Sequence, residues 1–273
     1  MMEEDDVVLG SISVMVNVCE ECKGKASGAC DRCQEEVARL VVQFERRHVL
    51  SLGLHLNLTE GWAVTGKDSL IVSKADTWPL ATPVDPWSPS YPGLARSHDD
   101  LAAEIEAQVL RLQSLVGPAV PIGHVDGHNH VHVHPGVAPA FATAVCDRLG
   151  LGPALRVRQV HRLLPSELPL ASAPAVFAAA SAHAWSTTWV DCAFQSPPLF
   201  AGLAGCLTAT EESFAAAVDD AAAAAVSAGE QGEVEFMCHP GDPQTDGRGD
   251  DFSRDAQRAA EARVLVLRAL DCE

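Results

Sequence analysis

Apolar and polar residues alternate along this chain in a pattern that predicts short strands separated by helices. Runs rich in β-branched residues, or with period-two alternation, indicate strands at residues 7–18, 50–58, 154–160 and 233–239. Apolar residues at helical spacing predict helices at residues 34–48, 99–115, 139–149, 211–228 and 255–270. Strands that alternate with helices imply an α/β architecture with mostly parallel strands.

Residues 124–136 alternate with special regularity, because every even position up to 134 is a metal-capable residue. The even positions are His124, Asp126, His128, His130, His132 and His134, which include five of the eleven histidines of the chain. Period-two alternation predicts a strand with these side chains on one face. At ~3.3 Å per residue the ends of the row would lie roughly 33 Å apart. We therefore expect one or two of them at a metal ion, with further ligands from elsewhere.

Two other predicted strands also carry a histidine among polar positions. In the segment GLHLNLTEG, residues 53–61, three leucines alternate with His55, Asn57 and Thr59. His239 ends the strand at 233–239, directly before a Pro-Gly pair. Barrel enzymes keep their functional groups at the C-terminal ends of their strands. A lone histidine in a strand is most often structural, but three such strand ends together predict a shared site in a barrel-like fold.

The cysteines offer a second kind of site. Four of the nine form the pattern Cys19-x2-Cys22-x7-Cys30-x2-Cys33 in a Cys-rich loop at residues 19–33. Paired CxxC motifs are typical of structural zinc, because four thiolates complete a tetrahedral shell. The gap of seven is shorter than the usual zinc spacings. The spacing therefore favours reduced thiols on a loop, with structural zinc as the alternative.

Composition narrows the classes of partner. A net charge of −18 argues against nucleic acid and anionic membrane surfaces. No uninterrupted run of about 18 apolar residues occurs, so we expect no membrane span. The acidic start MMEEDD differs from a basic signal peptide, which predicts a cytoplasmic location. Residues 62–97 are rich in Pro and Trp and predict a long loop.

The motifs resemble the YdjC-like family of carbohydrate deacetylases, which includes the chito-oligosaccharide deacetylases. The resemblance rests on SVMVN (13–17), GLHLNLTEG (53–61), HVDGHNHVHVHPG (124–136) and MCHPG (237–241), and more loosely on WVDCAFQSPPLF (189–200). It covers most of the chain. It implies one deacetylase domain over residues 1–273, built as an irregular (β/α) barrel of the glycoside hydrolase/deacetylase type.

The resemblance also implies a metal-dependent hydrolase that removes acetyl groups from N-acetylated oligosaccharides. One divalent ion, magnesium or zinc, would be held by His55, His128 and an aspartate, with His239 as the general acid–base. The metal would polarise the acetamide carbonyl and a water molecule, a base would deprotonate that water, and an acid would protonate the leaving amine.

Other residues of the motifs are expected around this centre. Asp126 is expected to support a ligand histidine, His128, rather than to bind the ion. Asn57, His130 and Asp191 are expected to support the ligands or line the substrate. We expect His124, His132 and His134 to be structural or supporting residues. The sequence leaves open whether the chain forms a homodimer.

One departure from the family concerns a carboxylate. The family begins with a strand that ends in an ADDFG-type motif, whose aspartates supply a metal ligand and the catalytic base. In this chain that strand would precede residue 1, and Asp5 and Asp6 fall where the family has the end of its first helix. We therefore expect the first strand to be missing, the C-terminus to be short and the activity to be weak. The alternative function is an inactive homologue that binds sugar or metal.

Overall fold

The computed structural model describes residues 11–17, 19–22, 29–46, 51–59, 62–66, 96–164, 172–196, 199–201, 210–227 and 233–238. The chain forms two compact units. The larger comprises Leu9–Arg158 and Ala179–Ser196, and the smaller comprises the rest. The predicted helix at 255–270, His239 and most of the loop at 62–97 lie outside the described residues.

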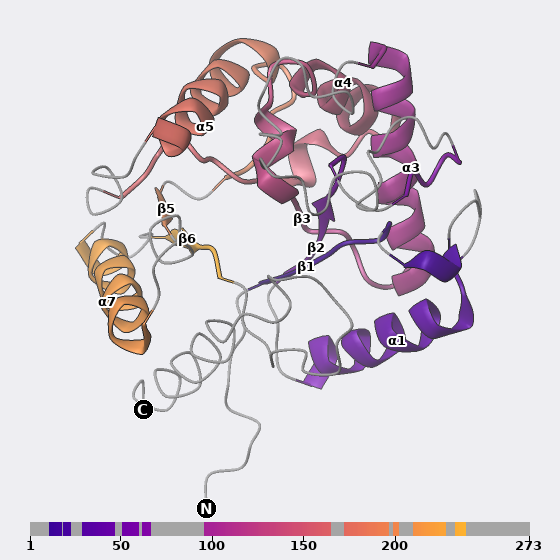
Figure 1. Ribbon diagram of the computed structural model, residues 1–273, viewed down its shortest axis with the longest axis horizontal. Coiled ribbons are helices and arrows are strands. Elements are labelled where there is room, and N and C mark those ends of the chain that lie inside the picture. Colours follow the sequence, from indigo (N-terminus) through magenta and orange to yellow (C-terminus); the bar gives the residue numbers. More distant parts are fainter. Residues whose placement is uncertain are drawn as a thin grey trace, which may run out of the picture. The chain divides into compact units, whose positions relative to one another are not determined.

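A parallel sheet of four strands forms the centre of the larger unit (Figure 1). Its strands lie side by side in chain order: β1 (Ser11–Val14), β2 (Ser51–Leu56), β3 (His124–Gly127) and β4 (Arg156–Val157). Every neighbouring pair is parallel. The predicted α/β architecture with parallel strands is therefore confirmed. Among the described residues, each strand is shorter than the sequence pattern predicts.

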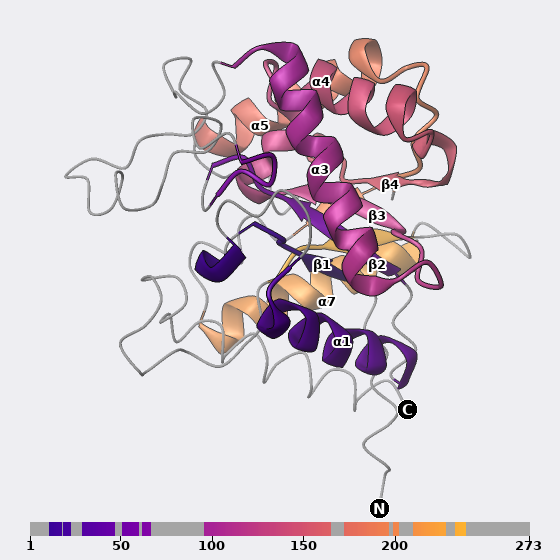
Figure 2. The same ribbon diagram turned by 90° about the vertical axis from the view of Figure 1, so that its right-hand side faces the viewer.

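Helices cover the leucine face of this sheet. Leu54, Leu56 and Leu58 are completely buried, as the alternation in residues 53–61 predicts. The long helix α3 (His98–Val116) packs beside β2 and contacts α1 (Asp31–Arg46) and α4 (Ala138–Ala142) (Figure 2). At its N-terminus the Ser97 side chain accepts a hydrogen bond from the Asp100 amide, and the helix closes at Gly117 with φ 80°.

The predicted strand at 124–136 is wrong beyond its first four residues. β3 ends at Gly127, and residues His128–Val133 form a kinked 3-10 turn, η3. Asn129 and His130 have φ of 51° and 56°, in the left-handed region that Asn tolerates better than most residues. Gly127 lacks a Cβ, and one there would collide with the main chain and ring of His132. The six even-numbered side chains therefore do not share one face.

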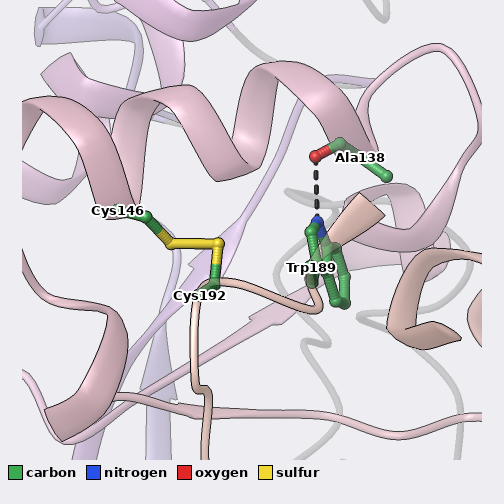
Figure 3. Close-up of a disulfide and its surroundings, with 4 residues drawn as sticks. All are labelled: Ala138, Cys146, Trp189 and Cys192. Carbon is green, nitrogen blue, oxygen red and sulfur yellow. Dashed lines mark hydrogen bonds between the residues drawn. A yellow bond between two sulfur atoms is a disulfide. The ribbon is translucent and has the colours of Figure 1, made fainter. Parts of the chain in front are cut away.

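A disulfide and a buried tryptophan hold the segment after α4. The helix continues as a π-helical turn, η4 (Thr143–Arg148), whose Cys146 forms a disulfide with Cys192 (Figure 3). Trp189 is buried and donates a hydrogen bond from Nε1 to the carbonyl oxygen of Ala138 at 2.9 Å. Trp189 follows a second π-helical turn, η7 (Ala184–Thr188). Disulfides are rare in cytosolic proteins, and this one therefore does not support the cytoplasmic location. That location stays a prediction from the acidic N-terminus.

The smaller unit contains a second parallel pair of strands, β5 (Leu199–Ala201) and β6 (Val234–Phe236). Helix α7 (Glu211–Ser227) packs beside β6 and begins with Thr210, whose hydroxyl accepts from the Ser213 amide. Both elements agree with the predicted helix and strand. Helix α5 (Ser172–His183) was not among the predicted helices, and it has residues in both units. In the larger unit, short 3-10 turns lie at Glu20–Cys22 (η1) and Gly152–Ala154 (η5).

Closure of the strands into a barrel stays a prediction. Within the described residues, no helix has both the length and the apolar character that crossing a membrane requires.

Candidate metal and catalytic site

A histidine, a carboxylate and a guanidinium group meet at the ends of three neighbouring strands. The register of the sheet places His55 on β2 directly beside Asp126 on β3. The Nδ1 of His55 lies 2.9 Å from Oδ1 of Asp126. Arg158, which follows β4, places Nη2 2.6 Å from Oδ2 of the same carboxylate. Both carboxylate oxygens are therefore engaged by a neighbouring strand.

The electrostatics of this group fix the tautomer of His55. Burial of Asp126 would raise its pKa, but the charge of Arg158 and the contact with His55 hold that pKa well below its usual range. An ionised carboxylate only accepts hydrogen bonds, so Nδ1 of His55 must carry the proton. The other ring nitrogen, Nε2, is then the one with a lone pair that can bind an ion. A carboxylate behind a ligand histidine is a common arrangement in metal sites.

The second predicted ligand, His128, lies next to His55. Their ring centroids are 5.4 Å apart, and the ring planes meet at 74°. Imidazole nitrogens bind divalent metals at about 2.1 Å, which places two rings on one tetrahedral ion with centroids roughly 5 Å apart. The residues present therefore fit a shared metal ion. The position of His128 as the first residue after β3 brings it to the same end of the sheet as His55.

Support of His128 by Asp126 stays a prediction, and the histidine that Asp126 contacts at 2.9 Å is His55. The reason is the register of β2 and β3. His55 and Asp126 are paired residues of adjacent strands, whereas His128 follows the strand end after Gly127 and enters the turn η3.

His124 has a structural role. Its ring lies over Gly53, where an added Cβ would collide with it. Its Nε2 is 2.8 Å from Oγ of Ser13 on β1, and its Nδ1 is 2.7 Å from Oγ of Ser51 on β2. Burial lowers its pKa to about 4, so the ring is neutral near pH 7. Both nitrogens serve to join three strands.

Asn57 belongs to a buried polar network at the end of β2. Its side chain bonds with that of Asn17, and its main chain exchanges two hydrogen bonds with Gln108 of α3. Gln108 also donates to Glu104, whose carboxylate accepts from the amides of residues 64 and 65. Asn57 is completely buried. Its contacts are those of a supporting residue, and its supporting or substrate-lining role stays a prediction.

The histidines that follow His128 in the chain differ in burial. His130 and His132 are both buried and neutral, because burial holds the pKa of His130 well below its ordinary value and lowers that of His132 to about 4. His132 donates from Nε2 to the carbonyl oxygen of Arg158 and stacks on Trp189. His134 is partly exposed and accepts from the Gly136 amide. These contacts give His132 and His134 structural roles.

Asp191 lies on the surface. It is exposed in the turn that leads from Trp189 to Cys192. Its supporting or substrate-lining role stays a prediction.

Arg158 takes part in this group of contacts and was not predicted from the sequence. The available signal in the sequence was an arginine two positions after Arg156 in the alternating stretch RVR of a predicted strand. The structure shows that Arg158 is buried. Gln108 and Glu104 were also not predicted. They are polar residues on the buried side of α3, and a buried polar group needs a hydrogen-bond partner, which was the available signal.

Fold and site together define an α/β protein with a histidine–carboxylate centre at the ends of parallel strands. The chain belongs to the YdjC-like protein family, whose family model matches residues 8–270.

Similar proteins of known name include carbohydrate deacetylases from three vertebrates. The Mus musculus protein is 30% identical over 270 residues, which cover 85% of this chain and 76% of the relative. The Danio rerio protein is 28% identical over 268 residues, covering 84% and 79%. The Homo sapiens protein is 30% identical over 145 residues, covering 50% and 36%. A crystal structure from Enterococcus faecalis, of a protein named for cellobiose-phosphate cleavage, covers 96% of this chain and 94% of its own with 14% identity and a TM-score of 0.48.

Proposed function

We propose that this chain is a metal-dependent carbohydrate deacetylase that hydrolyses the N-acetyl group of chito-oligosaccharide-like sugars. The observation that supports the proposal is the Arg158–Asp126–His55 chain of contacts with the ring of His128 beside it. The proposal is also supported by the membership of this chain in a family that has relatives named carbohydrate deacetylases. Polar groups arranged in this way at the ends of parallel strands are typical of a catalytic centre.

His55 and His128 are the residues that would hold the divalent ion, magnesium or zinc. Such an ion supplies a Lewis acid for the acetamide oxygen and lowers the pKa of bound water. The protein contributes the orientation of the ligands. Asp126 holds the proton on Nδ1 of His55 and so keeps Nε2 available, while Arg158 keeps Asp126 ionised. Two imidazoles leave further coordination positions for water and substrate.

Hydrolysis adds one water molecule across the amide bond. The water oxygen bonds to the acetyl carbon, the bond from that carbon to the sugar nitrogen breaks, and both protons of the water end on that nitrogen, so that acetate and an ammonium group are the products. We assign the proton transfer to His239, which follows β6 (Val234–Phe236) by three residues in the sequence. His239 itself lies outside the described residues.

A second candidate function is a homologue that binds sugar or metal without turnover. Within the described part of the chain, the only group of three or more metal-capable side chains is the cysteine cluster. The pair His55 and His128 therefore has no third ligand of this kind among those residues. A pair of imidazoles alone gives an incomplete shell, which favours weak metal binding and slow chemistry.

The two candidates are separated by acetate release. The purified chain is incubated with N,N′-diacetylchitobiose and either magnesium or zinc, and acetate is measured by an enzyme-coupled assay. The deacetylase proposal expects metal-stimulated acetate release that falls at least about 100-fold in His55→Ala and His128→Ala. His98→Ala is the matched control, because His98 is exposed at the start of α3. Sugar binding by calorimetry without acetate release would support the second candidate.

A further inference from the structure

Four cysteine side chains lie together between β1 and α1. The Sγ atoms of Cys19, Cys22, Cys30 and Cys33 all lie within 4.8 Å of one another. The Sγ atoms of Cys19 and Cys30 are 3.6 Å apart, and those of Cys22 and Cys33 are 3.7 Å apart. The two CxxC pairs are thus interleaved, with each pair contributing to both close contacts.

These separations match the edges of a metal-centred tetrahedron. Zinc binds thiolate sulfur at about 2.3 Å, so two sulfurs on one tetrahedral zinc ion lie roughly 3.8 Å apart. The two separations of 3.6 Å and 3.7 Å are close to that edge, and none of the others exceeds 4.8 Å. A disulfide would require sulfurs at about 2.05 Å. The arrangement is therefore that of four ligands around one point.

The local fold explains how a gap of seven residues reaches this geometry. The turn η1 carries Cys22, whose amide donates to the carbonyl oxygen of Cys19 at 3.0 Å. Cys30 directly precedes α1, and Cys33 lies in the first turn of that helix. A helix start brings residues three apart to the same side without a second loop. The spacing that argued against zinc in the sequence is thus compensated by a helix.

The surroundings also suit thiolates. Cys22 and Cys30 are buried, whereas Cys19 and Cys33 are partly exposed. The Cys30 amide donates to Sγ of Cys22 at 3.2 Å. Metal binding requires the deprotonated form of each cysteine.

We propose that Cys19, Cys22, Cys30 and Cys33 bind one structural zinc ion. Four protein ligands close the shell and leave no position for substrate, so the ion stabilises structure and takes no part in hydrolysis. Soft thiolates select zinc over magnesium. The ion would anchor the connection from β1 to α1. Asn17, two residues before Cys19, would be fixed with it, and Asn17 holds the buried side chain of Asn57.

The test is zinc content of the full chain, purified with a reductant and passed over a chelating column. The variant His55→Ala/His128→Ala serves as the reference, because it removes the proposed catalytic ligands and leaves only the cysteine cluster. Mass spectrometry of metals is expected to find about one zinc per chain in this variant. Adding Cys22→Ser should reduce the zinc content at least fivefold. Adding Cys238→Ser instead should leave it unchanged, since Cys238 is not part of the cluster.

A second measurement does not depend on the folding of a cysteine variant. Cobalt replaces zinc in the His55→Ala/His128→Ala protein, and a tetrahedral site of four thiolates gives intense sulfur-to-cobalt charge-transfer bands in the near ultraviolet. Their appearance at one cobalt per chain supports the proposal. Absence of zinc and of these bands, iron in place of zinc, or two disulfides found by mass spectrometry of the untreated chain would each overturn it. None of these outcomes bears on acetate release, so the proposed function is tested separately.

Discussion

Replacing Asp126 with asparagine tests the role of the carboxylate that joins two strands at the proposed metal centre. The two oxygens of Asp126 accept hydrogen bonds from His55 at 2.9 Å and from Arg158 at 2.6 Å. An asparagine side chain has one oxygen and one amino group, so it can accept from only one of these donors. If the oxygen stays with Arg158, the amino group lies against Nδ1 of His55. That contact forces the proton onto Nε2, the nitrogen needed by the ion.

The structure indicates the size of both effects. Removing a supporting partner of a ligand histidine typically lowers metal affinity by about 10–100-fold. The guanidinium of Arg158, with 8% of its side chain exposed, also loses its ionised partner. Breaking a buried ion pair by removing one partner typically lowers the free energy of unfolding by about 3–5 kcal/mol. We therefore expect Asp126→Asn to bind the ion at least about tenfold more weakly and to unfold at clearly lower urea concentration.

The assay is a titration with manganese, followed by electron paramagnetic resonance. Manganese prefers carboxylate and imidazole ligands over thiolates, so the cysteine cluster does not compete for it. Asp99→Asn is the matched control, because Asp99 pairs with Arg148 on the surface with 88% of its side chain exposed. An Asp126→Asn protein that is folded at the assay temperature and binds manganese within about twofold of the parent would refute the role of Asp126 as a supporting carboxylate.

Three further predictions concern stability and are measured by urea unfolding. Leu54→Ala should lower the free energy of unfolding by about 3 kcal/mol, because Leu54 is completely buried. Leu110 is half-exposed, so Leu110→Ala should change the free energy of unfolding by less than about 1 kcal/mol. Equal effects of the two substitutions would contradict the assigned core. Gly53→Ala should lower it by about 2 kcal/mol, because the methyl group meets the ring of His124, and an unchanged value would contradict that contact. In the folded chain the pKa values of His124 and His132 are lowered from 6.5 to about 4. The unfolded chain therefore binds more protons than the folded chain below about pH 6.5, and the free energy of unfolding falls as the pH falls. We expect a loss of about 2 kcal/mol per histidine between about pH 7 and pH 5. A free energy of unfolding that stays constant over that interval would show that these rings are not held neutral.

The elements that the sequence predicted well are those with strong local signals. The alternation of residues 53–61 identified the buried leucine face of β2, and the helical spacing of apolar residues over 99–115 identified α3. In these elements the apolar period and the capping residues point to the same structure, so packing had no reason to override them.

The histidine row shows where the pattern failed. Residues 124–134 alternate as a strand would, yet the chain turns after Gly127 because Gly127 and Asn129 tolerate a close approach and a positive φ. Alternation does not distinguish a strand from a turn whose odd and even residues are both buried, as Val131 and His132 are.

The contacts of the site depend on long-range pairing. His55 and Asp126 are 71 residues apart, and only the register of β2 with β3 makes them neighbours. Arg158 reaches the same carboxylate from the end of the next strand. The spacing of residues within a motif carries no information on this register, which is set by the packing of the whole sheet.

The most direct test of the proposed function is acetate release from N,N′-diacetylchitobiose by the chain with and without a divalent ion, measured beside its His55→Ala and His98→Ala variants. We predict acetate release that requires the ion, persists in His98→Ala and falls at least about 100-fold in His55→Ala. Release that is unaffected by His55→Ala, or a folded, metal-loaded chain that releases no acetate, would contradict a deacetylase centre built on His55 and His128.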